Sequence, residues 1–144
     1  MDDFTSDPSC NAFALRQATR SVSNLYDQYV GRCGLTGPQY SILSHISRNP
    51  HITIQALADK LVLDRTSLLR ALQPLTRDGY VLHAPSPDSP RKQVLALSST
   101  GQAKYVEAYK LWQQAQAEFE SKVGGEEAKA LRDALFKLTR MLNS

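Results

Sequence analysis

Apolar residues recur every three or four positions along most of the chain, and this spacing predicts helices. The first such stretch covers 10–31, the second covers 36–49, and a shorter one follows Thr53. Thr36 and Gln39 have the spacing of a capping box, in which each side chain accepts a hydrogen bond from a backbone N–H at the helix start. Thr53 is expected to cap the third helix.

The stretch 64–79, DRTSLLRALQPLTRDG, has two unlike faces when it is placed on a helix. Leu68, Leu72 and Leu75 fall on one face, and Asp64 can cap the helix start. Polar side chains fall on the opposite face or beside it, namely Thr66, Ser67, Arg70, Gln73 and Arg77. Burial of the leucine face would hold so short a helix, which leaves the polar face free to enter a groove of DNA. An ordinary surface helix has the same pattern.

Two β-like segments follow, 80–84 and 94–97, and the polar tip between them contains three prolines and ends in Arg91-Lys92. The prolines suit an exposed tip and would disrupt a central strand. Two short helices joined by a tight turn and followed by a hairpin with a basic tip have the order of a winged helix-turn-helix. We therefore expect residues 35–98 to form a DNA-binding lobe.

Long helical stretches flank this lobe. One helix is expected to begin at Ser98 or Ser99, and after Gly124-Gly125 a last helix carries a narrow leucine seam. Such a seam is typical of a helix that packs against partner helices. A compact winged helix should not need both flanking segments, so we expect 10–34 and 99–143 to form a homodimer interface within a single domain, 1–144. The predicted fold class is mainly α with a small β-hairpin wing (α+β).

Composition adds modest support for a nucleic-acid partner. The net charge is +3, and five basic against three acidic side chains lie between residues 64 and 92. No signal-peptide pattern opens the chain and no apolar run reaches the ~18 residues of a membrane span, so we expect a cytoplasmic protein without a membrane partner. Cys10 and Cys33 give neither a disulfide framework nor zinc spacing. No metal site, no cofactor and no enzymatic activity are expected.

Three stretches resemble the MarR (multiple antibiotic resistance regulator) family of bacterial transcription factors: LTGPQYSIL (35–43), ITIQALADKLVLDRTSLLRALQPLTRDGYV (52–81) and VLALSSTGQAKY (94–105). The middle stretch is the most specific, because it spans the whole helix-turn-helix with the spacing intact. The resemblance implies a homodimeric DNA-binding regulator with paired terminal helices and two winged-helix lobes. One departure concerns the wing, where the family usually has Asp-x-Arg and this chain has Ser89-Pro90-Arg91, with the acid displaced to Asp88.

The resemblance also implies how DNA would be bound. Arg65, Thr66, Ser67 and Arg70 occupy the family's contact positions in the major groove, and Arg70 could pair bidentately with guanine O6 and N7. Gln73 and Arg77 share the polar face and complete the predicted set on this helix. Arg91 is expected in the minor groove and Lys92 on a phosphate. A twofold dimer would read an imperfect palindrome with half-sites ~34 Å apart.

The family often binds small aromatic acids in a cleft between the dimer helices and the lobe. The candidate lining residues are Phe13, Tyr26, Tyr40 and Trp112, with plain core packing as the alternative for each. We predict a repressor that such a ligand releases from DNA.

Cys10 raises an alternative, a thiol-based redox-sensing regulator, because a helix N-terminus can lower the pKa of a thiol. Peroxide-sensing relatives place their cysteine at the position of Ala12 when the first helices are aligned on Arg20. Two further alternatives are a winged helix used for protein–protein contact and a thiol enzyme. The polar face of 64–78 argues against the first, and the lack of a His or second Cys near Cys10 in the sequence argues against the other.

Overall fold

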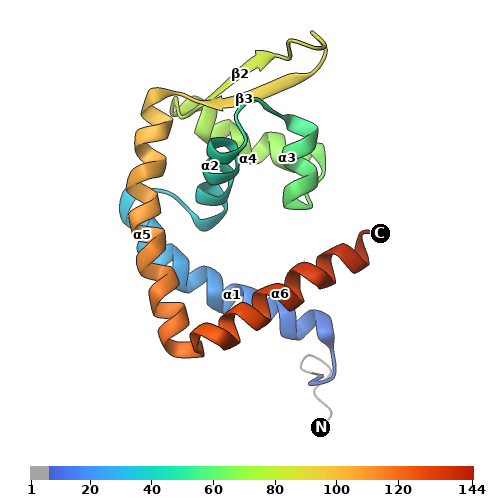
Figure 1. Ribbon diagram of the computed structural model, residues 1–144, viewed down its shortest axis with the longest axis vertical. Helices are drawn as coiled ribbons and strands as arrows, with labels where there is room; N and C mark the ends of the chain where they lie inside the picture. Colours follow the sequence, from blue (N-terminus) through green and yellow to red (C-terminus); the bar gives the residue numbers. More distant parts are fainter. Residues whose placement is uncertain (1–6) are drawn as a thin grey trace. The chain divides into compact units, whose positions relative to one another are not determined.

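The computed structural model describes residues 7–144 and confirms the predicted mainly helical fold with a small sheet (Figure 1). Its elements in chain order are α1 (Asn11–Val30), the short 3-10 helix η1 (Gly31–Cys33), α2 (Gly37–Arg48), β1 (Ile52–Thr53), α3 (Ile54–Leu61), α4 (Arg65–Arg77), β2 (Val81–Pro85), β3 (Gln93–Leu97), α5 (Ser99–Val123) and α6 (Gly125–Leu142). The chain divides into two compact units. We call residues 30–111 the lobe, and residues 7–29 with 112–144 the helical unit.

The helices of the lobe begin where the sequence predicts. The Thr36 side chain accepts a hydrogen bond from the Gln39 backbone N–H, and the Gln39 side chain accepts one from the Thr36 N–H, which completes the capping box of α2. Thr53 caps α3 by accepting from the Ala56 N–H. Of the two serines expected to start α5, Ser98 is the cap, since its hydroxyl accepts from the Gly101 N–H.

The sheet of the lobe has three antiparallel strands in the order β1-β3-β2. Strands β2 and β3 form the predicted hairpin, with Val81 opposite Leu97 and Pro85 opposite Gln93. The third strand, β1, was foreseen only as an extended piece, because two residues are too few to show an alternating pattern. It pairs with β3 near the strand's middle, so the hairpin is anchored to the chain segment that precedes α3.

The core of the lobe is aliphatic. Leu68, Leu72 and Leu75 are at most 1% exposed, which confirms the predicted buried face of α4. The other large side chains that are fully buried come from the remaining elements of the lobe: Val30, Leu43, Ile46, Leu57, Val81 and Leu95. Burial of each such side chain contributes roughly 1.5–3 kcal/mol, enough in sum to fix α4 on the lobe by one face.

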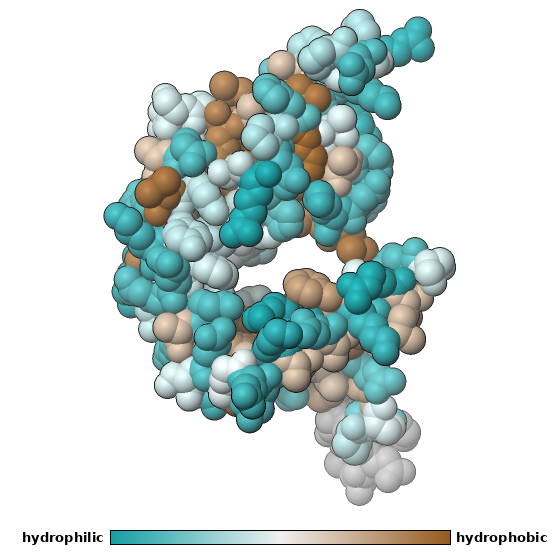
Figure 2. All heavy atoms as spheres, in the orientation of Figure 1, coloured by the Kyte–Doolittle hydropathy of each residue, from teal (hydrophilic) through white to brown (hydrophobic). Residues whose placement is uncertain are grey.

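The helical unit contains most of α1, the second half of α5 and all of α6. Tyr26 of α1 donates a hydrogen bond to Gln116, and Tyr29 donates one of 2.7 Å to Glu118. Few apolar side chains of this unit are buried, and apolar residues interrupt its hydrophilic surface (Figure 2). Those that stay exposed lie on α1 and α6 and include Leu15, Val22, Leu131, Leu135, Phe136, Met141 and Leu142.

Cys10 and Cys33 do not share the first helix. Cys10 precedes α1, where its carbonyl accepts from the Ala14 N–H and its sulfur accepts from the Phe13 N–H at 3.4 Å. Cys33 ends η1 and donates its thiol hydrogen to the Val30 carbonyl at 3.2 Å. Among residues 7–144, no helix has both the length and the apolar character that crossing a membrane requires.

Candidate nucleic-acid interface

Helix α4 presents its polar face to solvent. Asp64 caps the helix, because its carboxylate accepts from the Ser67 N–H at 2.7 Å and from the Ser67 hydroxyl at 3.0 Å. These hydrogen bonds, the backbone one first, hold the pKa of Asp64 below its ordinary value. The carboxylate is therefore ionised at neutral pH and stabilises the first turn of the helix, where backbone N–H groups lack partners.

The predicted DNA-contacting residues of α4 lie where a groove could reach them. Ser67 is half-buried, whereas the others are exposed: Arg65, Thr66, Arg70, Gln73 and Arg77. Arg77 forms an ion pair of 3.5 Å with the adjacent Asp78, an exposed contact that contributes little to stability. Leu69, at the edge of this face, is 37% exposed, so the face itself is polar and does not resemble an apolar protein-docking surface.

The hairpin tip is hydrophilic (Figure 2), and backbone hydrogen bonds close it. The Ser86 N–H donates to the Lys92 carbonyl at 2.7 Å, and the Lys92 N–H donates to the Ser89 carbonyl at 3.1 Å. Arg91 and Lys92 are both exposed. No ion pair joins Asp88 to Arg91 in the part of the chain that the structure describes. The tip that carries Arg91 is thus shaped by its backbone hydrogen bonds and prolines.

A side-chain contact links α4 to the wing. The Thr76 hydroxyl lies 3.0 Å from His83 Nε2, and His83 is part of β2. At the same junction the Tyr80 N–H donates to the Leu75 carbonyl at 2.9 Å. The end of α4 and the base of the wing are therefore held together by one backbone and one side-chain hydrogen bond.

The four aromatic candidates for a ligand pocket are not brought together. Tyr40 belongs to the lobe, where it is 7% exposed and stacks on Tyr105 with ring centroids 5.8 Å apart; burial raises its pKa. Phe13, Tyr26 and Trp112 belong to the helical unit.

A pocket with a volume of about 400 Å³ lies in the helical unit, and of the four candidates only Tyr26 lines it. Its other walls include Phe119, Leu131, Arg132 and Phe136. Sequence reasoning placed Phe119 and Leu131 on apolar stripes but did not assign them to a pocket. Arg132 and Phe136 had no such signal, because they lie beside the leucine seam of α6.

Cys10 is exposed at the start of α1. Within residues 7–144, no three side chains of His, Cys, Asp or Glu gather as a metal site would require.

A buried leucine face, an exposed polar recognition helix and a basic hairpin tip define a winged-helix DNA-binding protein. A model of the MarR family matches residues 34–92, and the chain belongs to this family. The crystal structure of the transcriptional regulator MosR from Mycobacterium tuberculosis in complex with DNA is 30% identical, with 94% of this chain and 97% of that chain covered and a TM-score of 0.84. The family resemblance and the expected fold class are confirmed.

Two further relatives match along most of the chain. The homoprotocatechuate degradative operon repressor of Escherichia coli is 28% identical over 131 residues, which are 91% of this chain and 88% of the relative. The organic hydroperoxide resistance transcriptional regulator of Bacillus subtilis is 24% identical with the same coverage of both chains. The chain is accordingly a DNA-binding transcriptional regulator and not an enzyme.

Proposed function

We propose that this chain is a repressor that binds a palindromic operator as a homodimer, with α4 in the major groove and the hairpin tip at the minor groove. The observation that carries the proposal is the orientation of α4, whose leucines are buried while Arg70 and Gln73 are exposed on the opposite face. The Arg70 guanidinium can donate two hydrogen bonds to guanine O6 and N7. Arg65, Thr66, Ser67, Gln73 and Arg77 would reach neighbouring base edges or phosphates.

The exposed apolar surface of the helical unit supports a homodimer. Phe136 is 58% exposed and Leu135 is 39% exposed on α6, and both line the pocket of about 400 Å³. Large apolar patches of this kind usually mark an interface. We assign the helical unit of a second copy as the partner, which fits the leucine seam that runs along α6. Two lobes in such a dimer would read half-sites ~34 Å apart.

The Arg70→Ala variant tests the reading role of α4. Operator fragments selected from genomic DNA serve as the probe, and binding is measured by fluorescence anisotropy. We expect affinity for the selected site to fall by roughly tenfold to a hundredfold, the 1–3 kcal/mol of one bidentate contact, with relaxed preference at the contacted guanine. Lys110→Ala, which removes a positive charge from an exposed position of α5, is the matched control. Unchanged affinity and preference in Arg70→Ala would remove Arg70 from the mechanism.

We infer that a phenolic acid is the releasing ligand. The Escherichia coli relative is named for an operon that degrades such a compound, which supports this chemical class. Tyr26, which lines the pocket of the helical unit, and Phe13, Tyr40 and Trp112 remain the proposed contacts. Phenolic acids and peroxides would be screened for release of the selected DNA, and a set of phenolic acids without effect would count against this ligand class.

A redox-sensing regulator is the second candidate. The Cys10 thiol is exposed at a helix start and accepts a backbone N–H, as a sensing thiolate would. The Bacillus subtilis relative is named for organic hydroperoxide resistance. Mass spectrometry after treatment with one equivalent of peroxide would detect oxidation of Cys10, and an unmodified Cys10 would end the redox hypothesis.

A further inference from the structure

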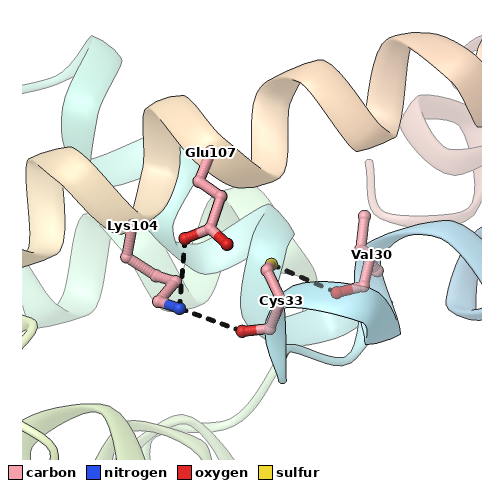
Figure 3. A network of polar contacts seen from close by, with 4 residues as sticks. All are labelled: Val30, Cys33, Lys104 and Glu107. Atoms are coloured by element: carbon pink, nitrogen blue, oxygen red, sulfur yellow. Dashed lines mark hydrogen bonds and ion pairs between the residues drawn. The ribbon is translucent and has the colours of Figure 1, made fainter.

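Lys104 of α5 joins three segments of the lobe (Figure 3). Its Nζ donates a hydrogen bond of 3.0 Å to the Cys33 carbonyl, at the end of η1, and lies 3.3 Å from Glu107 Oε2. The same ammonium lies 5.9 Å from the centroid of the Tyr80 ring. The Lys104 side chain is 20% exposed, whereas that of Glu107 is 56% exposed, so Lys104 reaches into the lobe and Glu107 covers it from outside.

The contacts of Lys104 stabilise its charge in a largely enclosed position. Desolvation lowers the pKa of Lys104, but the hydrogen bond to Glu107 and the negative potentials of Tyr80 and Glu107 outweigh it and raise the pKa overall. The Cys33 carbonyl ends a short helix, where a cation is favoured. The ring of Tyr80 adds a cation–π contact on another side of the ammonium. Lys104 therefore remains a cation in place, and its donors are used within the lobe.

Tyr80 lies at the point where α4 passes into the wing. Its N–H donates to the Leu75 carbonyl of α4, and its carbonyl accepts from the Ser98 N–H at 3.0 Å, just before α5. The next residue, Val81, begins β2. A cation that holds the Tyr80 ring on α5 thus constrains the exit of the recognition helix and the base of the wing together.

We propose that Lys104 is a positioning residue for DNA binding, which sets the spacing between α4 and the wing by tying Tyr80 and Cys33 to α5. This inference rests on the proposed roles of Arg70 and Arg91 as DNA contacts. Lys104 does not touch DNA itself. Its loss misplaces the two contacts relative to each other, so neither groove is engaged in full.

A salt series separates positioning from direct contact. Lys104→Met keeps the length of the side chain and removes its charge and donors, and Lys104→Arg keeps both. We expect Lys104→Met to lower operator affinity about tenfold while the slope of log affinity against log salt stays at the wild-type value. Lys104→Arg should recover most of the affinity. Full affinity in Lys104→Met, or a slope reduced by about one as for a lost phosphate contact, would overturn the proposal.

A double-mutant cycle tests the coupling to the wing. In an Arg91→Ala background, Lys104→Met should weaken binding less than it does in the wild type, because the contact it positions is already absent. Additive losses would overturn the proposal. If circular dichroism shows that Lys104→Met does not fold, Tyr80→Leu replaces it in both experiments and must give the same pattern. Should Arg70→Ala and Arg91→Ala both bind normally, the proposed function fails, a result distinct from additivity in the cycle.

Discussion

A Cβ atom placed on Gly101 would lie 2.1 Å from the backbone carbonyl oxygen of Tyr80. Gly101 is in the first turn of α5, and Tyr80 precedes β2. No atom pair can approach so closely, so only glycine allows the start of α5 to lie against the base of the wing. The Ser98 hydroxyl reinforces the junction by donating to the Gly79 carbonyl.

Gly101→Ala is expected to destabilise the protein, although alanine is the better helix former. In an open helical position this change stabilises by about 1 kcal/mol, but here the obstructing atom is backbone and α5 must shift. The free energy of unfolding from urea denaturation should fall by about 1–3 kcal/mol, the range for an overpacked site. Gly125→Ala at the start of α6 is the matched control, because a Cβ there meets nothing within 4 Å. Equal stability of the two variants would contradict the clash.

The cap of the recognition helix gives a pH dependence with a definite sign. Hydrogen bonds from Ser67 hold the pKa of Asp64 below its ordinary value of 3.8, so the folded protein favours the ionised carboxylate. Its contribution to stability is fully present above pH 3.8 and is lost as pH falls through the lower pKa of the folded state. Asp64→Asn should therefore be less stable than the wild type at pH 7, with the difference shrinking in acid. Thermal unfolding from pH 7 to pH 2.5 measures it, and a gap that does not change with pH would argue against the carboxylate as cap.

Arg91 is expected to act on the flanks of the operator. An arginine in the minor groove gains most where A·T tracts narrow the groove and strengthen its negative potential. Arg91→Ala should thus weaken binding more for operators with A·T flanks than for operators with G·C flanks. Anisotropy titrations with the two flank types at one salt concentration test this, with Lys92→Ala as the control for loss of charge. An equal loss on both flanks would place Arg91 outside the minor groove.

Local signals in the sequence were enough for the elements of the lobe. Thr36, Thr53 and Asp64 each act on backbone groups within three residues, so their capping can be predicted without the tertiary structure. The leucine face of α4 follows from periodicity alone. Strand β1 pairs with residues more than forty positions away, and no two-residue pattern carries that information.

The pocket was harder to predict than the fold. Which side chains line it depends on how α1, α5 and α6 pack within the helical unit, and this is why Tyr26 lines it and Phe13 and Trp112 do not. The clasp at Lys104 had no signal either, because a lysine in a long amphipathic helix usually faces solvent. Its partners, a carbonyl and a ring, come from segments 24 and 71 residues away.

The exposed apolar side of α6 leads to a prediction about assembly. Phe136 is 58% exposed and lines the pocket of the helical unit, so a second copy would bury it. Phe136→Glu places a charge there and should weaken the dimer at least about thirtyfold, as loss of a hot-spot residue does. Sedimentation equilibrium over a range of concentrations measures the change.

The matched control for Phe136→Glu is Ala130→Glu, which adds the same charge to an exposed position on the opposite side of α6. A monomer has one reading head, so Phe136→Glu should bind a full operator about as weakly as it binds a half-site, whereas Ala130→Glu should still prefer the full operator. The reason is that a dimer engages its second half-site at high effective concentration. If both variants remain dimers with wild-type affinity, α6 does not form the interface through this face.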